Sequence, residues 1–239
     1  MRVIVLLTLA WLSTGAIAQG ARELIENSLR RHAPPPYVYQ EQTLIITNAL
    51  GQHTVRTARF YGRTDQTGAK RLLVMETPAD LRGARIFVER DAQGERRHGP
   101  DPSSAVFGTD FSVADFEGEQ AGDFAYALED SQDLDRESHY VVRASPKNEA
   151  VSRATGYRVR RIFLRKDTLF VSRIDFLDRQ GRSAKRRTFR DPRPDESGVW
   201  RAGMILTEDL IEERRTLIKI ERRVHSADYV PDTIFAGLR

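Results

Sequence analysis

Apolar and polar residues alternate over most of the chain, and this alternation predicts strands rather than helices. The segment 37–47 is rich in Tyr, Val, Ile and Thr, the residues typical of strands. Short polar connections follow each such segment, which is typical of hairpins. We expect strands at 37–47, 54–63, 70–77, 84–90, 124–129, 139–144, 157–165, 168–177, 182–190, 199–207 and 214–225, with loops at 91–102, 129–137, 146–155 and 191–198.

One helix precedes the strands, and a packed tail follows them. Residues 21–31 place Leu24, Ile25 and Leu29 on one face of an amphipathic helix. The three prolines at 34–36 end this helix and force an extended connection. In the tail, 229–239, apolar residues recur at helical spacing and are expected to pack.

The segment 104–118 interrupts the strand pattern and is called the lid loop below. Its phenylalanines are separated by glycines and aspartates, which break any alternation. Asp110 or Ser112 is expected to cap one short helical turn, with Asp115 near its start. We predict a compact aromatic loop that covers the open end of a sheet, and we assign its lid or gate role to Phe107, Gly108, Asp110, Phe111, Asp115 and Phe116.

These elements predict an α+β fold that is mostly β. An open sheet seldom exceeds about ten strands without curling, and about eleven are expected here. We therefore expect an unclosed, strongly curved antiparallel barrel with an N-terminal helix and a short helical lid loop. Its apolar face forms either a cavity or a solid core, and both alternatives stay open. The inward candidates, by alternation and aromatic content, are Phe60, Leu73, Met75, Phe87, Phe163 and Phe176.

The N-terminus has the pattern of a signal peptide. A positive start precedes an apolar run of about ten residues, too short to span a bilayer. Ala16-Ile17-Ala18 is an A-x-A cleavage site, which predicts a signal peptide at 1–18 and one domain at 19–239. The chain has no cysteine, which excludes disulfides and thiolate metal sites. The net charge of +4 is small in so charged a chain, so we expect no nucleic acid partner, although peripheral contact with an anionic membrane is compatible with it.

Motifs of catalysis are missing from the sequence. It contains no GxSxG elbow, P-loop or GxGxxG, and its five histidines show no metal-ligand spacing. We expect no enzyme activity, cofactor or metal; a hydrolase would need His139 or His225 beside a carboxylate. The basic groups 158–161, 185–187 and 222–223 are expected to point mostly outward from their strands.

Several motifs, in order, resemble the outer-membrane lipoprotein-sorting family, the LolA-like proteins. GTDFSVADF at 108–116 is similar to the family's G-[ST]-D-F-[ST]-x-x-D-[FLM] segment. PADLRGARIFV at 78–88, the hairpin at 173–185, the strand from Trp200, and the segments 216–220 and 232–238 also match family patterns. The family's fold is an incomplete, strongly curved barrel with helices at its mouth.

The resemblance implies a periplasmic carrier that binds the acyl chains of a lipid or lipoprotein in an apolar cavity. It also implies transport toward the outer membrane and association with an inner-membrane transporter of the resistance-nodulation-division type, since the resembled subgroup is often linked to such pumps. The alternative is a periplasmic adaptor that docks on such a transporter and binds no lipid itself.

Overall fold

The computed structural model of the chain describes residues 12–118, 121–155, 157–178 and 180–238. In that part of the chain, twelve strands form one antiparallel sheet in the order β5-β4-β3-β2-β1-β12-β11-β10-β9-β8-β7-β6. The strands are β1 Tyr37–Thr47, β2 His53–Asp65, β3 Gly68–Thr77, β4 Arg85–Asp91, β5 Arg96–His98, β6 Phe124–Leu134, β7 Glu137–Pro146, β8 Val159–Arg165, β9 Val171–Leu177, β10 Ser183–Pro194, β11 Trp200–Asp209 and β12 Arg214–Val224. The helices are α1 Leu12–Arg31, α2 Val113–Glu117 and α3 Glu149–Thr155, with short 3₁₀ turns η1 Ala121–Asp123, η2 Ala227–Tyr229 and η3 Asp232–Phe235.

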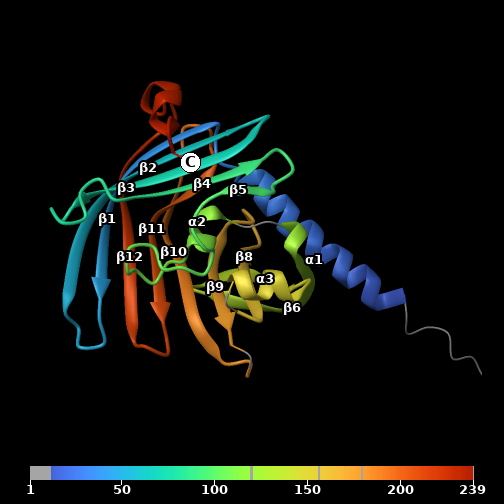
Figure 1. Cartoon of the computed structure of the whole chain (residues 1–239). Helices are drawn as coiled ribbons and strands as arrows, with labels where there is room; N and C mark the ends of the chain where they lie inside the picture. The colour runs from blue at the N-terminus through green and yellow to red at the C-terminus, as the bar shows by residue number, and fades with distance from the viewer. Residues whose placement is uncertain (1–11, 119–120, 156, 179, 239) are drawn as a thin grey trace, which may run out of the picture.

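The sheet curls strongly but does not close, because the edge strands β5 and β6 do not pair with each other (Figure 1). Its two faces have different partners. The inner face is the one that lines the hollow and contacts α2; the outer face is the one that the C-terminal segment covers. The predicted fold class, an unclosed curved antiparallel barrel with an N-terminal helix, is confirmed.

Local turn chemistry fixes the register of the first hairpin. The Asn48 carboxamide oxygen accepts hydrogen bonds from the backbone N–H groups of Leu50 and Gln52, both at 3.0 Å. Gly51 supplies the positive φ of +77° that this turn requires. Strand β1 is then paired with β2 along its whole length, from Thr47 opposite His53 to Tyr37 opposite Arg63.

Helix α1 covers the inner face at the β6 end of the sheet. Ala21 and Ile25 are buried there against side chains from β6, β7 and β8. The Ser28 hydroxyl donates to the Leu169 carbonyl at 2.8 Å, which ties the helix to the turn between β8 and β9. The predicted helix at 21–31 is therefore present, and it extends back to Leu12. Residues 1–11, which hold most of the predicted signal peptide, lie outside the described residues, so cleavage after Ala18 stays a prediction.

The C-terminal segment packs on the outer face. Val230, Phe235 and Leu238 are buried against Leu72 and Phe87, next to two tyrosines of β1 and β2. The predicted packing of the tail is confirmed, although the tail forms 3₁₀ turns.

Four connections differ from the sequence-based expectations. Strand β6 continues through the acidic segment expected as a loop, and the chain reverses at Asp135 and Arg136, whose φ values of +53° and +69° are those of a tight two-residue hairpin turn. Residues 149–155 form α3, residues 96–98 form β5, and β10 runs on to Pro194. In each case pairing or packing with a neighbouring element outweighs a polar local sequence, which alone predicts a loop.

Candidate functional site: the inner face and its lid

The lid loop, residues 104–118, lies in the hollow of the sheet (Figure 1). Phe111 and Val113 are buried in one cluster with Leu73 and Met75, so the lid supplies part of the core of the inner face. The other buried members are Leu44, Ala58, Ile86, Val88 and Val106, and the partly buried members are Phe60, Leu81, Ala84, Phe107, Phe116, Ile205 and Ile218.

The lid holds its own shape through internal hydrogen bonds. Ser112 caps α2: its hydroxyl accepts from the Asp115 N–H at 3.3 Å, and the Asp115 carboxylate accepts from the Ser112 N–H at 2.9 Å. Phe107 and Gly108 form a left-handed corner, with φ values of +47° and +69°. The Thr109 hydroxyl donates to the Val106 carbonyl across this corner at 2.7 Å. The predicted short helical turn and its Ser112 cap are therefore present.

A buried ion cluster joins the lid to β10. Asp115 Oδ2 lies 2.6 Å from Lys185 Nζ and 2.6 Å from Arg187 Nη2, and all three side chains are less than a tenth exposed. Burial alone would raise the pKa of Asp115, but the adjacent Arg187 and Lys185 cations hold that pKa well below its usual range. The carboxylate is thus ionised, and we call these three residues the Asp115 cluster.

Further polar contacts hold the other parts of the lid. The Thr216 hydroxyl donates to the Asp110 carboxylate at 2.6 Å and accepts from the Asp110 N–H at 3.0 Å. Three guanidinium groups donate to backbone carbonyls of the lid: Arg56 to Phe107, Arg71 to Phe116, and Arg214 to Gly108. The lid is thus joined to the sheet by contacts that involve side chains, not by strand pairing. Its one β-bridge pairs Ala105 with Ser112, both within the lid itself.

An interior cavity of about 270 Å³ lies between the lid and strands β8 to β11. Its walls are mainly apolar and come from both sides, with Phe111 on the lid and Ile174, Phe176, Phe189 and Ile205 on the sheet. The Asp115 cluster borders it through Asp115 and Arg187. The inner face is therefore not a completely filled core.

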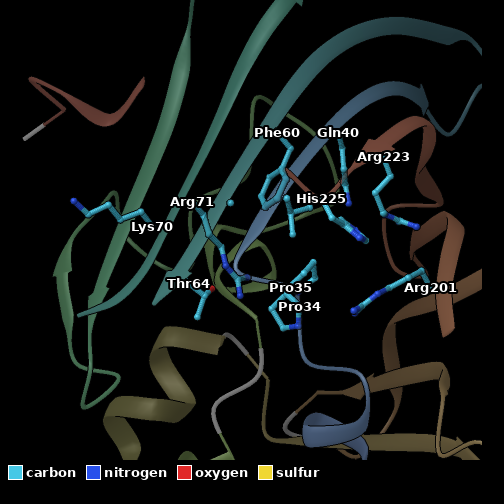
Figure 2. Close-up of a pocket in the computed structure, with 12 residues that line it drawn as sticks. Pro34, Pro35, Gln40, Phe60, Thr64, Lys70, Arg71, Arg201, Arg223 and His225 are labelled. Atoms are coloured by element: carbon cyan, nitrogen blue, oxygen red, sulfur yellow. The ribbon is translucent and has the colours of Figure 1, made fainter. Parts of the chain in front are cut away.

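A second pocket of about 200 Å³ opens where the α1–β1 connection crosses the inner face. Phe60 and Val38 form apolar parts of its wall, and Arg71, Arg201 and Arg223 surround them (Figure 2). The Arg71 guanidinium also donates to the lid at Phe116, at 2.7 Å, so this pocket borders the lid as well.

Four of the six predicted interior residues face the hollow. Phe60 contacts the lid residue Phe116 edge-to-face, with ring centroids 5.6 Å apart. Leu73 and Met75 lie in the lid cluster, and Phe176 lines the interior cavity. That these residues bind lipid stays a prediction.

The other two face outward, which corrects the sequence-based assignment. Phe87 packs on the outer face against Phe235 of the C-terminal segment, with ring centroids 6.1 Å apart. Phe163 lies beneath the guanidinium of Arg173, 3.9 Å from its ring centroid, and its neighbours Ile162 and Leu164 are the ones that face α1. In both strands apolar residues occur on both faces, so aromatic content did not identify the inner one.

The expectation that basic residues point outward is wrong at several positions. Lys185 and Arg187 point inward in the Asp115 cluster, and only Arg186 between them points outward, to Asp175 at 2.8 Å. Arg223 also lines the inner pocket. The alternation in β10 could have indicated this orientation. Lys185 and Arg187 lie on the same side of the strand as the apolar Phe189, because side chains two residues apart share a face.

The two histidines considered for hydrolysis do not contact a carboxylate through a hydrogen bond in the described part of the chain. His139 Nδ1 contacts the Glu137 carbonyl at 2.7 Å, and its Nε2 contacts the Ser172 hydroxyl at 2.9 Å. His225 Nε2 is buried without a hydrogen-bond partner. Within the described residues, no group of three or more His, Asp or Glu side chains could hold a metal ion, and no helix has the length and apolar character needed to cross a bilayer.

A family model described as an uncharacterized protein family matches residues 95–237, more than half of the chain. The chain belongs to this family. The matched region contains the lid loop and all strands from β5 to β12. No curated protein matches the sequence.

Solved structures share the fold over nearly the whole chain. An outer membrane lipoprotein-sorting protein domain from Vibrio parahaemolyticus has a TM-score of 0.81 at 16% identity, covering 92% of this chain and 98% of its own. A DUF1329 family protein from Desulfovibrio piger has a TM-score of 0.78 at 19% identity, covering 91% and 98%. A LolA superfamily protein from Nitrosomonas europaea has a TM-score of 0.69 at 14% identity, covering 91% and 97%. The fold is therefore LolA-like, as the sequence motifs predicted.

Proposed function

We propose that this protein is a carrier, without enzyme activity, that binds the acyl chains of a lipid or lipoprotein on the inner face of the sheet. The observation that carries the proposal is the lid: an aromatic loop fills the hollow, yet it is held there mainly by side-chain contacts. A LolA-like fold, shared with a protein described as lipoprotein-sorting, supports the same reading.

The cavities indicate how much the lid must move. Pockets for small-molecule ligands usually measure about 300–1,000 Å³. The interior cavity, at about 270 Å³, falls below that range, so a long acyl chain does not fit while the lid stays in place. When the lid is displaced, the apolar residues under Phe111 and Val113 become available, and each buried CH₂ of a chain contributes about 0.8 kcal/mol.

The lid contacts suit a reversible gate. An acyl chain that replaces Phe111 and Phe116 on the inner face restores the lost apolar contacts, while Lys185 and Arg187 regain water when the lid leaves. Phe107, Gly108, Asp110, Phe111, Asp115 and Phe116 are the proposed gate, and Phe60, Leu73, Met75 and Phe176 are the proposed binding surface.

The proposed cellular setting rests on the sequence. The A-x-A site before Gln19 supports export and cleavage of residues 1–18, followed by action in the periplasm. The resemblance to the transporter-associated subgroup supports delivery toward the outer membrane, with cargo received from an inner-membrane transporter of the resistance-nodulation-division type.

Native mass spectrometry of protein purified from its own cells without detergent tests the carrier proposal. We expect a population heavier than the bare chain by the mass of a lipid, which organic extraction removes. Bare protein that also shows no saturable uptake of added lipid would contradict the proposal and favour a docking adaptor.

A disulfide between lid and sheet tests the gate separately. The chain has no cysteine, so Asp110→Cys with Thr216→Cys creates a single possible pair, at positions whose side chains already touch. We expect the oxidised variant to take up a fluorescent fatty acid at least tenfold more slowly than the same protein after reduction. Each single variant, treated with oxidant and reductant in the same way, is the control. Equal uptake in both redox states of the double variant would remove the lid from the mechanism.

A further inference from the structure

The pocket beside the α1–β1 connection has a one-sided charge. Its lining includes Lys70, Arg71, Arg201 and Arg223 as well as His225, and it includes no Asp or Glu. Figure 2 shows Arg71 on one side of Pro34 and Pro35, with Arg201, Arg223 and His225 on the other side, while Lys70 points away from the group. Lys70 instead lies 3.4 Å from Glu89. We call the remaining four basic residues the arginine pocket.

Two of its arginines, Arg71 and Arg223, are partly buried cations that lie outside ion-pair distance of a carboxylate. The carboxylates that attract them, Glu117 for Arg71 and Asp195 for Arg223, act from farther away. Arg71 donates to the Phe116 carbonyl at 2.7 Å, and Arg223 donates to the Ala202 carbonyl at 2.9 Å. Within the described part of the chain, neither of them forms an ion pair. Burial lowers the pKa of Arg223, and it lowers that of Arg71 to about 10. A desolvated cation of this kind is stabilised by an anionic ligand.

The other two members have different roles. Arg201 is already occupied: it contacts Asp195 at 3.1 Å and donates to the carbonyls of His32 and Ala33, both at 2.7 Å. It therefore fixes the α1–β1 connection that forms one wall. His225 Nε2, in contrast, is buried with no hydrogen-bond partner, which leaves a polar ring atom available in a pocket that already holds two cations.

The pocket is also joined to the proposed acyl site. Phe60 lines the pocket and contacts Phe116 of the lid, and Arg71 bonds the same residue through its carbonyl. At about 200 Å³ the pocket has room for a small polar group but not for a lipid chain. A molecule with an anionic end here could extend its apolar part along Phe60 onto the inner face.

We propose that the arginine pocket binds the anionic headgroup, a phosphate or carboxylate, of a lipid whose acyl chains lie on the inner face. Arg223 and His225 contact the headgroup oxygens, and Arg71 joins them when it releases the lid carbonyl. Arginine is well suited to this role because its planar fork of N–H groups matches phosphate and carboxylate oxygens. This inference rests on the proposed carrier function and adds the class of lipid.

Two probes with the same acyl chain separate the headgroup from the chain. Lysophosphatidic acid carries a phosphate, and the matching monoacylglycerol carries none; their affinities for the full chain are measured by titration against a displaceable fluorescent lipid. We expect the phosphate-bearing probe to bind at least tenfold more tightly. Arg223→Gln should weaken that probe about tenfold or more, in line with loss of a charged hydrogen bond, and leave monoacylglycerol unchanged.

Arg222→Gln is the matched control. This residue precedes Arg223 on the same strand, but it faces outward, where its guanidinium bonds the Tyr229 hydroxyl at 2.7 Å. The same charge is lost, so any general electrostatic effect on anionic lipid appears in both variants. If Arg223→Gln does not fold, Arg223→Met serves instead, since an apolar chain of similar length leaves no buried amide to satisfy.

Each outcome has a separate meaning. If both probes bind equally and Arg223→Gln changes neither, the headgroup site is refuted and the carrier function stands. If neither probe binds, the carrier function fails and the headgroup site fails with it. If inorganic phosphate alone competes as well as lysophosphatidic acid while monoacylglycerol does not bind, the pocket is a site for a free anion, which refutes its role as a lipid headgroup site.

Discussion

Replacing Asp115 with asparagine is expected to loosen the lid without unfolding the sheet. The substitution keeps the shape of the side chain but removes the charge that faces Lys185 and Arg187, each 2.6 Å from Oδ2. Two cations then remain buried with no carboxylate between them. They regain water only if the lid moves away, so the substitution favours an open lid.

The magnitude follows from the burial of the cluster. Each pair at 2.6 Å corresponds to an attraction of about 6 kcal/mol at an effective dielectric constant of about 20, and the desolvation of three buried groups offsets much of this. Removing one partner of a buried ion pair costs about 3–5 kcal/mol. Since every 1.4 kcal/mol changes an equilibrium constant tenfold, the ratio of open to closed lid should rise by about two to four powers of ten.

Amide hydrogen exchange measures that population directly. One lid amide reports on closure: the Asp110 N–H donates to the Thr216 hydroxyl of β12 at 3.0 Å, and it loses this partner when the lid leaves the sheet. Its exchange should accelerate in Asp115→Asn, while amides in the paired centre of β1 and β2 keep their protection. Glu76→Gln is the control, because it breaks the exposed Arg59–Glu76 pair at 2.7 Å, where less than about 1 kcal/mol is expected.

The pH dependence gives a second readout with a definite sign. The pKa of Asp115 is lower in the folded protein than its ordinary value of about 3.9, so the carboxylate stabilises the closed lid above that value and loses its effect only as pH falls through the depressed native pKa. Lid protection should therefore be constant from pH 8 to pH 5 once intrinsic exchange rates are corrected. The reasoning is refuted if Asp115→Asn protects the lid as well as the native residue does, or if its effect equals that of Glu76→Gln.

Two further pairs of substitutions test which face of the sheet binds lipid and whether the backbone at Gly118 is strained. Phe235→Ala should lower stability by about 3 kcal/mol, measured by denaturant unfolding, and leave lipid uptake unchanged, because Phe235 packs on the outer face. Met75→Ala, on the inner face, should lower stability similarly and alter lipid uptake. Equal uptake in the two variants would contradict the assignment of faces. Gly118→Ala should lower stability by about 1–2 kcal/mol, because φ is +88° and the added Cβ would lie 3.0 Å from Arg71 Nη1. The control Gly122→Ala, whose added Cβ has nothing within 4 Å, should be near neutral. Equal thermal midpoints for the two variants would show that the backbone at Gly118 is not strained.

The fold was predictable because its signals are local and repeated. Residues 37–47 form a strand with the predicted bounds, and the turn after it, capped by the Asn48 side chain, fixes the hairpin register. The short helix of the lid was also predictable, since Ser112 and Asp115 have the spacing of a capping box. Hairpins joined in sequence leave few topologies to choose from, and the curled antiparallel sheet follows.

The site was predictable only in part, because the sequence does not show which lid residue meets which strand. Asp115 was assigned to the lid as a helix-start residue, and its two cations lie 70 or more residues away on β10. Basic residues in strands usually face water, so the inward Lys185 and Arg187 were expected outside. The inward assignment of Phe87 and Phe163 was wrong for a different reason. The outer face is also covered, by the C-terminal segment and by guanidinium groups, so a buried aromatic residue does not identify the inner face.

The arginine pocket depends on a single irregularity in β12. Ile218 and Ile220 face the hollow opposite Leu44 and Gln42, but the register shifts between Glu41 and Gln42, so that Arg222 pairs with Glu41 and Arg223 pairs with Gln40. One extra residue reverses the faces of all side chains that follow it. Without this bulge, strict alternation from Ile220 would turn Arg223 outward and leave Arg222 in the hollow. The bulge therefore decides that Arg223 and His225 join Arg71 on the inner face, and no pattern of residue types in 214–225 marks its position.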